Sequence, residues 1–478
     1  MRKLLTLIWL VGVCVGCSQY RVTDDPTCKL QFSCDTLCFD TVFTAQGSAT
    51  MQLMVYNRNA QAVLIDHVSM AEGKAFLVNV DGEADLSRLT RVQLDGGDSL
   101  YVFVRVDVDP THVNSPVLIS DLLSFHLTTG VTQSVVLEAW GQDVQRLGKK
   151  GGRQYLNDYT FTAEKPYLIT DTLIIQGALT LAPGATLYMH NGACVYALGN
   201  VTANGTQDES IKICGDRLDR LFDSVPYRFA SGSWNGLYLI AEQAGIQYRL
   251  SYVDILSGNV GLYCYSERKE GLPYLRMDGC RIHNHALYGL VLIHTDALIS
   301  NSEFSNCSSY CVYCAGGTHE FVHTTVASYY GYTNIRIQST PKDDAAAVYI
   351  DNLSKEKPET VTSFYNSIIT GWLQNQVVVA TPFDQYYPGI FEGNYLKTDT
   401  LRMPHAANNT YWQTTDSAEV FRNTFYRYKE YVYYDFRLDS LSPAIGIGDS
   451  LKAQDYPTDR VGVSRLNCRP DAGCYQHE

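Results

Sequence analysis

Short segments recur along the middle of the chain at a nearly fixed spacing, and this recurrence limits the possible fold more than any other feature. Four segments align on their third residues, which are Ile255, Ile282, Phe304 and Val326. A second strand-like segment follows each of them, at residues 262–264, 290–293, 312–314 and 335–337. Two segments that return together about every 22 residues are typical of a solenoid. Because the segments are short and lack a helical period, they predict a parallel β-helix.

The repeat also fixes which side chains should point inward. Stacked coils lie about 4.8 Å apart, so the four aligned residues should form one buried column. Two positions later, a polar column of stacked side chains should satisfy backbone groups at a corner of each coil. Its members are Ser257, Asn284, Asn306 and Ser328.

Cysteines fall in the second strand of several coils. Residues two apart share a face of a strand, so Cys264 and Cys314 should point inward, with Leu292 between them and Ile337 after them. A buried cysteine in such a column behaves as a small apolar residue. We therefore disfavour the zinc site that the spacing Cys307-x3-Cys311-x2-Cys314 would otherwise suggest.

Residues 30–142 have a different pattern, in which apolar and polar residues alternate and turn residues separate the runs. About seven short strands in ~110 residues predict a β-sandwich. Residues 143–164 contain Gly148-Lys149-Lys150-Gly151-Gly152 and are predicted to be a linker. The predicted β-helix occupies residues 165–478 and includes a C-terminal closing segment.

The N-terminal residues have the features of an export signal. Met1-Arg2-Lys3 is basic, and the apolar run at 4–15 is too short to span a bilayer. The ending Val15-Gly16-Cys17 resembles the bacterial lipoprotein signal, which implies a signal peptide at 1–16, a lipid on Cys17 and a tether at 17–29. An ordinary secretory signal is the alternative. In the oxidising space that either signal implies, Cys468 and Cys474 are candidates for a disulfide because they close a short loop.

Two longer resemblances support this architecture. Residues 180–185, 442–446 and 470–475 resemble the right-handed parallel β-helix family, which is also called pectin-lyase-like. Val55-Tyr56-Asn57 and Ala139-Trp140-Gly141 resemble immunoglobulin-like domains of the hydin and major-sperm-protein type. Together they are similar to lipoproteins of Bacteroidetes-type bacteria. The resemblance implies an all-β chain, with an immunoglobulin-like β-sandwich followed by a right-handed parallel β-helix. It also implies a place in the cell envelope, as an outer-membrane lipoprotein that is periplasmic or exposed at the surface.

Three groups of side chains are candidates for chemistry. Asp254, Arg281 and Glu303 flank the apolar column and should form an outward stack, which is either a surface charge ladder or a site for a uronate. Asp216, Asp219 and Asp223 are candidate calcium ligands, although they lack the spacing of a ligand loop. Dense aromatics, such as those at 329–330, 386–387, 411–412 and 426–434, could instead pack against sugar rings.

The formal net charge is −13, which argues against a nucleic-acid partner. The β-helix resemblance implies an extended polysaccharide as ligand. Polysaccharide lyases of this class need a base and a bound calcium, and hydrolases need paired acidic residues. No complete set of catalytic residues is present, so we expect a non-catalytic protein, anchored in the membrane by lipid, that binds glycans or the envelope. A polysaccharide lyase or glycoside hydrolase is the first alternative and a structural spacer the second. No cofactor is expected other than the calcium that a lyase would use.

Overall fold

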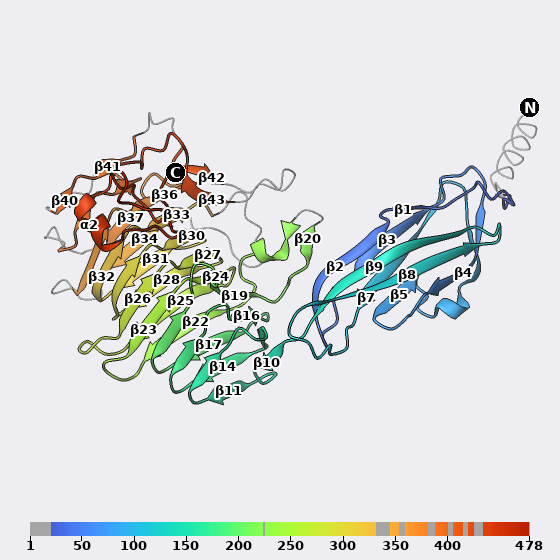
Figure 1. The fold of residues 1–478 in the computed structure, drawn as a ribbon, viewed down its shortest axis with the longest axis horizontal. Helices are drawn as coiled ribbons and strands as arrows, with labels where there is room; N and C mark the ends of the chain where they lie inside the picture. The colour runs from blue at the N-terminus through green and yellow to red at the C-terminus, as the bar shows by residue number, and fades with distance from the viewer. Residues whose placement is uncertain are drawn as a thin grey trace, which may run out of the picture. The chain divides into compact units, whose positions relative to one another are not determined.

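The computed structural model describes residues 21–222, 225–330, 345–352, 359–380, 388–399, 405–413, 419–424 and 434–477. The chain divides into two compact units, Met1–Asp143 and Val144–Glu478 (Figure 1). The first unit contains two packed β-sheets and the second contains three long parallel sheets. Cys17, the predicted lipid attachment site, lies outside the described residues. No helix among the described residues is long and apolar enough to cross a bilayer.

The first unit is the predicted β-sandwich. One sheet consists of β1 (Gln31–Phe32), β3 (Met51–Tyr56), β7 (Ser99–Val106) and β5 (Phe76–Val80). The other consists of β2 (Thr36–Phe43), β9 (Thr132–Gln142), β8 (Val117–Leu127), β4 (Val63–Met70) and β6 (Thr90–Leu94), with the short helix η1 (Leu86–Arg88) before β6. Alternation along β7 shows why the sheets pack, since Leu100, Val102 and Val104 are buried and the residues between them are exposed. The predicted tether already contacts this unit at Thr23, whose amide donates to the Ala62 carbonyl at 2.9 Å.

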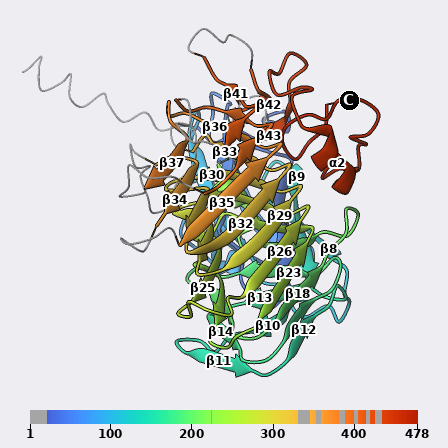
Figure 2. The ribbon, with the colours of Figure 1, turned by 90° about the vertical axis from the view of Figure 1, so that its left-hand side faces the viewer.

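The second unit is a parallel β-helix whose coils contribute strands to three sheets (Figure 2). The eleven-strand sheet contains β10 (Gln145–Leu147), β13 (Tyr167–Ile169), β16 (Thr186–Met189), β19 (Ile211–Gly215), β24 (Val253–Leu256), β27 (Arg281–His285), β30 (Glu303–Cys307), β33 (Thr325–Ser328), β36 (Ile368–Gly371), β39 (Tyr395–Leu396) and β41 (Thr410–Tyr411). The nine-strand sheet contains β11 (Arg153–Leu156), β14 (Thr172–Ile175), β17 (Cys194–Ala197), β22 (Gly236–Ala241), β25 (Val260–Ser266), β28 (Tyr288–Ile293), β31 (Val312–Ala315), β34 (Val348–Asp351) and β37 (Val377–Ala380). The ten-strand sheet contains β12 (Tyr159–Phe161), β15 (Leu179–Leu181), β18 (Val201–Asn204), β23 (Gln247–Ser251), β26 (Tyr274–Asp278), β29 (Asp296–Ser300), β32 (Gly317–Val322), β35 (Thr360–Tyr365), β38 (Phe391–Glu392) and β40 (Ala406–Ala407).

Shorter elements complete the unit. A hairpin of β20 (Arg220–Phe222) and β21 (Val225–Pro226) is followed by the short helix η2 (Tyr227–Phe229). After the last coils, β42 (Phe421–Asn423) pairs with β43 (Asp435–Leu438), and α2 (Ser450–Asp455) follows. We call residues 435–477, which follow the coils, the closing segment.

The glycine-rich segment before the β-helix is not a linker. Residues 143–164 include β10, β11 and β12, which pair in parallel with β13, β14 and β15 and so form the first coil. Gly148 and Gly151 have φ values of 103° and 69°, which glycine adopts at little cost. The glycines therefore make the turn between two strands of this coil, and the predicted linker was wrong.

The predicted register of the apolar column is confirmed. Ile255 pairs with Ile282, Ile282 with Phe304, and Phe304 with Val326, and all four side chains are fully buried. At the polar column, Ser257, Asn284 and Asn306 have φ values of 60°, 64° and 54°, and the Asn284 amide donates to the Ser257 hydroxyl at 3.0 Å. Asparagine tolerates this left-handed conformation better than most residues do. Ser328, the fourth predicted member, instead ends β33.

The inward cysteines are also confirmed. Cys264 pairs with Leu292 and Leu292 with Cys314, and all three are fully buried. The next residue in this column is Ile350, whereas the predicted Ile337 lies outside the described residues. A longer connection after β33 delays the next strand, so the 22-residue spacing does not continue there. Burial raises the pKa of the Cys314 thiol to about 12, which keeps it protonated and makes it a poor metal ligand.

The column should dominate the stability of the β-helix. Phe304→Ala is expected to lower the free energy of unfolding by about 3–5 kcal/mol, because it removes a fully buried ring and leaves a cavity. Chemical denaturation with circular dichroism would measure the loss. Leu298→Ala, on the partly exposed face of β29, is the control and should cost much less. Equal losses in the two variants would contradict the assigned register.

Candidate functional site

The predicted charged stack lies on three neighbouring strands of the eleven-strand sheet. Asp254 on β24 pairs in register with Arg281 on β27, which pairs with Glu303 on β30. Arg281 Nε donates to a Glu303 oxygen at 3.2 Å, and Arg460 from the closing segment donates to Asp254 at 2.7 Å. The three side chains therefore lie on the outer face of the β-helix, as predicted, but one of their partners comes from a distant part of the chain.

The stack is not an exposed surface ladder, which corrects the prediction. The Glu303 side chain is only 2% exposed. It accepts hydrogen bonds from the Ser305 hydroxyl at 2.6 Å and the Tyr475 hydroxyl at 2.7 Å. The closing segment covers this face because its apolar residues pack there: Phe436, Leu438, Ala444, Ala472, Cys474 and Tyr475 form a second small core with Ala327, Ile368 and Tyr395.

The electrostatics of Glu303 make it a poor general acid. Burial would raise the pKa of Glu303, but Arg281, His283 and the Ser305 hydroxyl lower it to about 2. Glu303 and Arg281 therefore hold each other in their charged forms. A general acid or base must change its protonation state near neutral pH and must reach a substrate. This group instead joins the closing segment to the coils.

The two candidate calcium ligands that the structure describes, Asp216 and Asp219, each contact a basic or imidazole side chain. An Asp216 carboxylate oxygen lies 2.6 Å from His190 Nδ1. Asp219 accepts a hydrogen bond from Arg217 Nε at 2.6 Å. Asp223 lies outside the described residues. Within the described ranges, no group of three or more His, Cys, Asp or Glu residues is arranged to hold a metal ion.

The predicted disulfide is absent, and both cysteines are free thiols. Cys474 is buried in the small core under the closing segment, where its amide donates to the Thr325 hydroxyl at 3.1 Å. Cys468 is exposed, and its sulfur accepts a hydrogen bond from the side-chain amide of Gln476 at 3.5 Å. Packing against the coils therefore fixes the position of Cys474 without a covalent bond.

The outer face of the nine-strand sheet carries a feature that sequence reasoning missed. Tyrosines lie on six consecutive strands or directly beside them, and we call this group the tyrosine strip: Tyr196, Tyr238, Tyr263, Tyr265, Tyr288, Tyr310, Tyr313 and Tyr349. Tyr196 pairs with Tyr238, Tyr238 with Tyr263, and Tyr313 with Tyr349. All eight are partly exposed. The strands that carry them follow one another along the β-helix (Figure 1).

The rings of the strip contact one another. Tyr196 and Tyr238 are stacked with 4.8 Å between their centroids, and Tyr313 and Tyr349 are stacked with 5.8 Å between theirs. The Tyr238 and Tyr263 rings are 5.7 Å apart and tilted by 46°. Stacked rings stabilise one another and limit side-chain motion, so the strip is preorganised for a ligand.

A signal for this strip was present in the sequence. In segments 262–264 and 312–314 the tyrosine stands between two residues that point inward. Alternation along a strand requires the middle residue to point outward. Aligning the middle positions of the second strands would have found one outward column of Tyr196, Tyr238, Tyr263, Tyr313 and Tyr349, which only Val291 on β28 interrupts.

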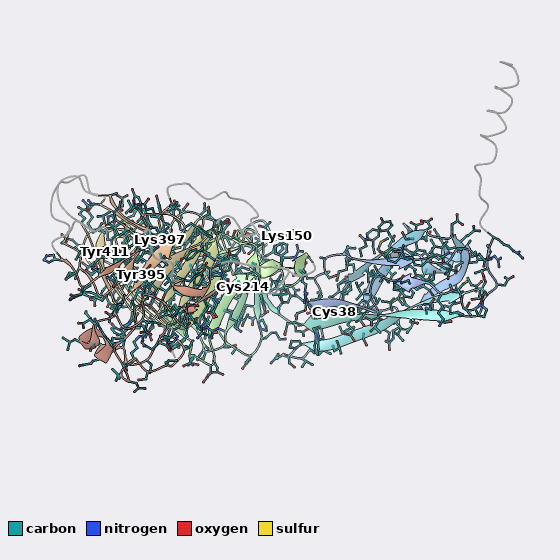
Figure 3. All side chains as sticks on the ribbon, turned by 90° about the horizontal axis from the view of Figure 1, so that it is seen from above. Cys38, Lys150, Cys214, Tyr395, Lys397 and Tyr411 are labelled. Carbon is teal, nitrogen blue, oxygen red and sulfur yellow. The ribbon has the colours of Figure 1, made fainter. Side chains whose placement is uncertain are left out.

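The aromatic runs that the sequence did single out serve other purposes where they are described. Tyr329 packs against Trp372 and Phe436. Lys397 lies over the Trp412 ring, 4.6 Å from its centroid, in the region where Figure 3 labels Lys397 and Tyr411. These contacts pack the last coils. Residues 386–387 and 426–433 lie outside the described residues.

Several solved structures are similar to about a quarter of this chain. No protein-family model matches the chain, and no curated protein matches it. Among solved structures, the PapD-like domain 7 of human CEP192 is 14% identical, with 27% of this chain and 97% of that chain covered and a TM-score of 0.19. A protein of unknown function from Porphyromonas gingivalis W83 is 15% identical. The match covers 27% of this chain and 59% of that chain, with a TM-score of 0.19.

The Vibrio cholerae VesB protease is 15% identical, with 24% of this chain covered and a TM-score of 0.18. The match spans about a third of the protease, 32% of its length. Likenesses of this size do not assign an activity to the chain. The structure itself shows an antiparallel β-sandwich followed by a parallel β-helix.

Buried histidines of the β-helix should make its stability depend on pH. Burial lowers the pKa of His283 to about 3 and the pKa values of His285 and His319 to about 4. In the unfolded chain a histidine has a pKa of about 6.5, so below that pH the unfolded chain binds protons that the folded chain does not. Stability should be highest above pH 6.5. It should fall between pH 6.5 and about 4, by at most about 1.4 kcal/mol per pH unit for each histidine.

Urea unfolding at a series of pH values would measure this slope. His319→Asn should make the slope shallower, because it removes one of the buried histidines, which also include His323 with its lowered pKa. Glu303, with its lowered pKa of about 2, should add a further loss only below about pH 4.5. A midpoint that stays constant from pH 7 to pH 4 would contradict the burial of these histidines.

Proposed function

We propose that this protein is a lipid-anchored component of a bacterial cell envelope that binds glycans through the tyrosine strip, without a catalytic step. The observation that carries the proposal is the strip itself. Tyrosine offers an apolar ring and a hydroxyl in one rigid side chain, which suits sugars because they also present both apolar and hydroxyl-bearing surfaces. The family resemblance of the β-helix supports a polysaccharide as ligand.

The environment of the charged stack favours binding over catalysis. Glu303 is enclosed by Tyr475, Ser305 and Arg281, and Asp254 is paired with Arg460. The polysaccharide lyase and hydrolase alternatives need such residues to be open to a substrate. They predict that the purified protein releases unsaturated or reducing ends from polysaccharides, and we expect no such release, with or without calcium.

The strip should be required for glycan binding. Tyr238→Ala and Tyr313→Ala are each expected to weaken binding about tenfold, because tyrosine is enriched among the interface residues whose truncation costs more than about 1 kcal/mol. Isothermal titration with a polysaccharide that a glycan array selects would measure the change. Tyr274→Ala, on the outer face of the ten-strand sheet, is the matched control and should bind as the unmodified protein does. If the control and the strip variants lose binding equally, the strip is not the site.

The anchor should depend on Cys17. Cys17→Ala is expected to release the protein from membranes, since the acyl chains on a single cysteine would supply the hydrophobic attachment. Fractionation of cells followed by a high-salt wash would show where the variant goes. A variant that remains with the membrane after the wash would exclude lipidation at Cys17.

A further inference from the structure

The direction of the tyrosine strip constrains the shape of its ligand. Its members follow six consecutive strands, from Tyr196 on β17 to Tyr349 on β34. Strands in a sheet are about 4.8 Å apart, so five steps correspond to about 24 Å along the β-helix. A single sugar ring would contact one or two of these tyrosines. An extended chain that lies along the β-helix would contact all of them.

The strands that carry the strip almost lack charge, although the exposed Arg153 on β11 of the same sheet acts electrostatically on Tyr196 at one end of the strip. The seven strands from β14 to β34 contain one charged residue, Asp351, which is at the end of β34. Its carboxylate accepts a hydrogen bond from the Tyr313 hydroxyl at 2.9 Å. An acidic glycan loses hydration when it binds and needs Arg or Lys to compensate for that loss. These strands offer neither, and Asp351 would repel an anion.

Four tyrosines of the strip keep their hydroxyl groups protonated over the whole physiological range, because each has a raised pKa. Burial and the neighbouring Tyr196 raise the pKa of Tyr238 to about 12. Burial also raises the pKa values of Tyr196, Tyr263 and Tyr313. A neutral phenol can both donate and accept a hydrogen bond. The stacked rings of Tyr196 and Tyr238 cover one another, so a ligand there would meet ring edges and a row of hydroxyls.

From these observations we infer that the tyrosine strip binds a neutral, extended polysaccharide whose chain runs along the β-helix. This inference rests on the proposed function and narrows it. The ligand class follows from the absence of cationic side chains on these strands. The orientation follows from tyrosines that repeat from coil to coil.

The test uses the full chain and two sets of probes. The first set compares neutral polysaccharides, namely glucan, xylan and mannan, with acidic polygalacturonate and alginate, in affinity gel electrophoresis at low and high salt. The second is a length series of oligosaccharides prepared from the neutral polymer that binds best. Binding should be confined to neutral glycans and should not weaken as salt increases. Affinity should rise at least tenfold between a disaccharide and an oligomer that spans about 24 Å, which is the length of five strand spacings.

Variants at the two ends of the strip test the orientation. Tyr196→Ala and Tyr349→Ala should each reduce the affinity of long oligomers about tenfold and leave that of a disaccharide almost unchanged. Tyr196→Phe retains the stacked ring and should lose only the contribution of the hydroxyl. Tyr274→Ala is again the control. Thermal unfolding of each variant should be measured first, so that only folded variants are compared.

Four other outcomes would contradict the inference. Tighter binding of acidic glycans, or binding that weakens steeply with salt, would overturn the neutral ligand while leaving the proposed function intact. Affinity that does not change with oligomer length would overturn the orientation. If no glycan binds, both this inference and the proposed function fail. A dimer that Tyr238→Ala dissociates would show that the strip joins two copies of the chain instead.

Discussion

The second unit depends on one constraint, which is that a coil of this kind cannot bury its own apolar side chains. Each coil contributes only short strands, and its inward residues are covered by the coils above and below. Ile255, Ile282 and Phe304 are fully buried only because their neighbours are stacked in register. The left-handed corner residues Ser257, Asn284 and Asn306 follow from the same requirement, since every coil must turn at the same place.

Stacking has a second consequence on the outside of the β-helix, where equivalent residues also form columns. On the eleven-strand sheet this brings Asp254, Arg281 and Glu303 next to one another, and the closing segment then buries Glu303 through Tyr475. On the nine-strand sheet it brings tyrosines next to one another, and these remain partly exposed. The same geometry therefore gives a partly buried group of ion pairs on one face and a preorganised aromatic surface on another.

The two faces differ in what their groups can do. The charged groups satisfy one another, so removing one partner would leave a buried charge without compensation, and this ties the closing segment to the coils. The tyrosine side chains are partly exposed, so a ligand can reach their rings and hydroxyl groups. This contrast makes the tyrosine strip, and not the charged stack, the stronger candidate for recognition.

The sequence by itself determined the sandwich, the β-helix, the buried column and the inward cysteines, because alternation and a repeat are local properties of the chain. It also placed Asp254, Arg281 and Glu303 in equivalent positions of successive coils. Only the tertiary structure decided that Glu303 is buried, since its partner Tyr475 is 172 residues away in sequence. The glycine-rich segment at 143–164 became a coil because β13, β14 and β15 were there to pair with it. Burial and partnership at a given residue depend on which distant segment packs over it, and a local pattern carries no information about that segment.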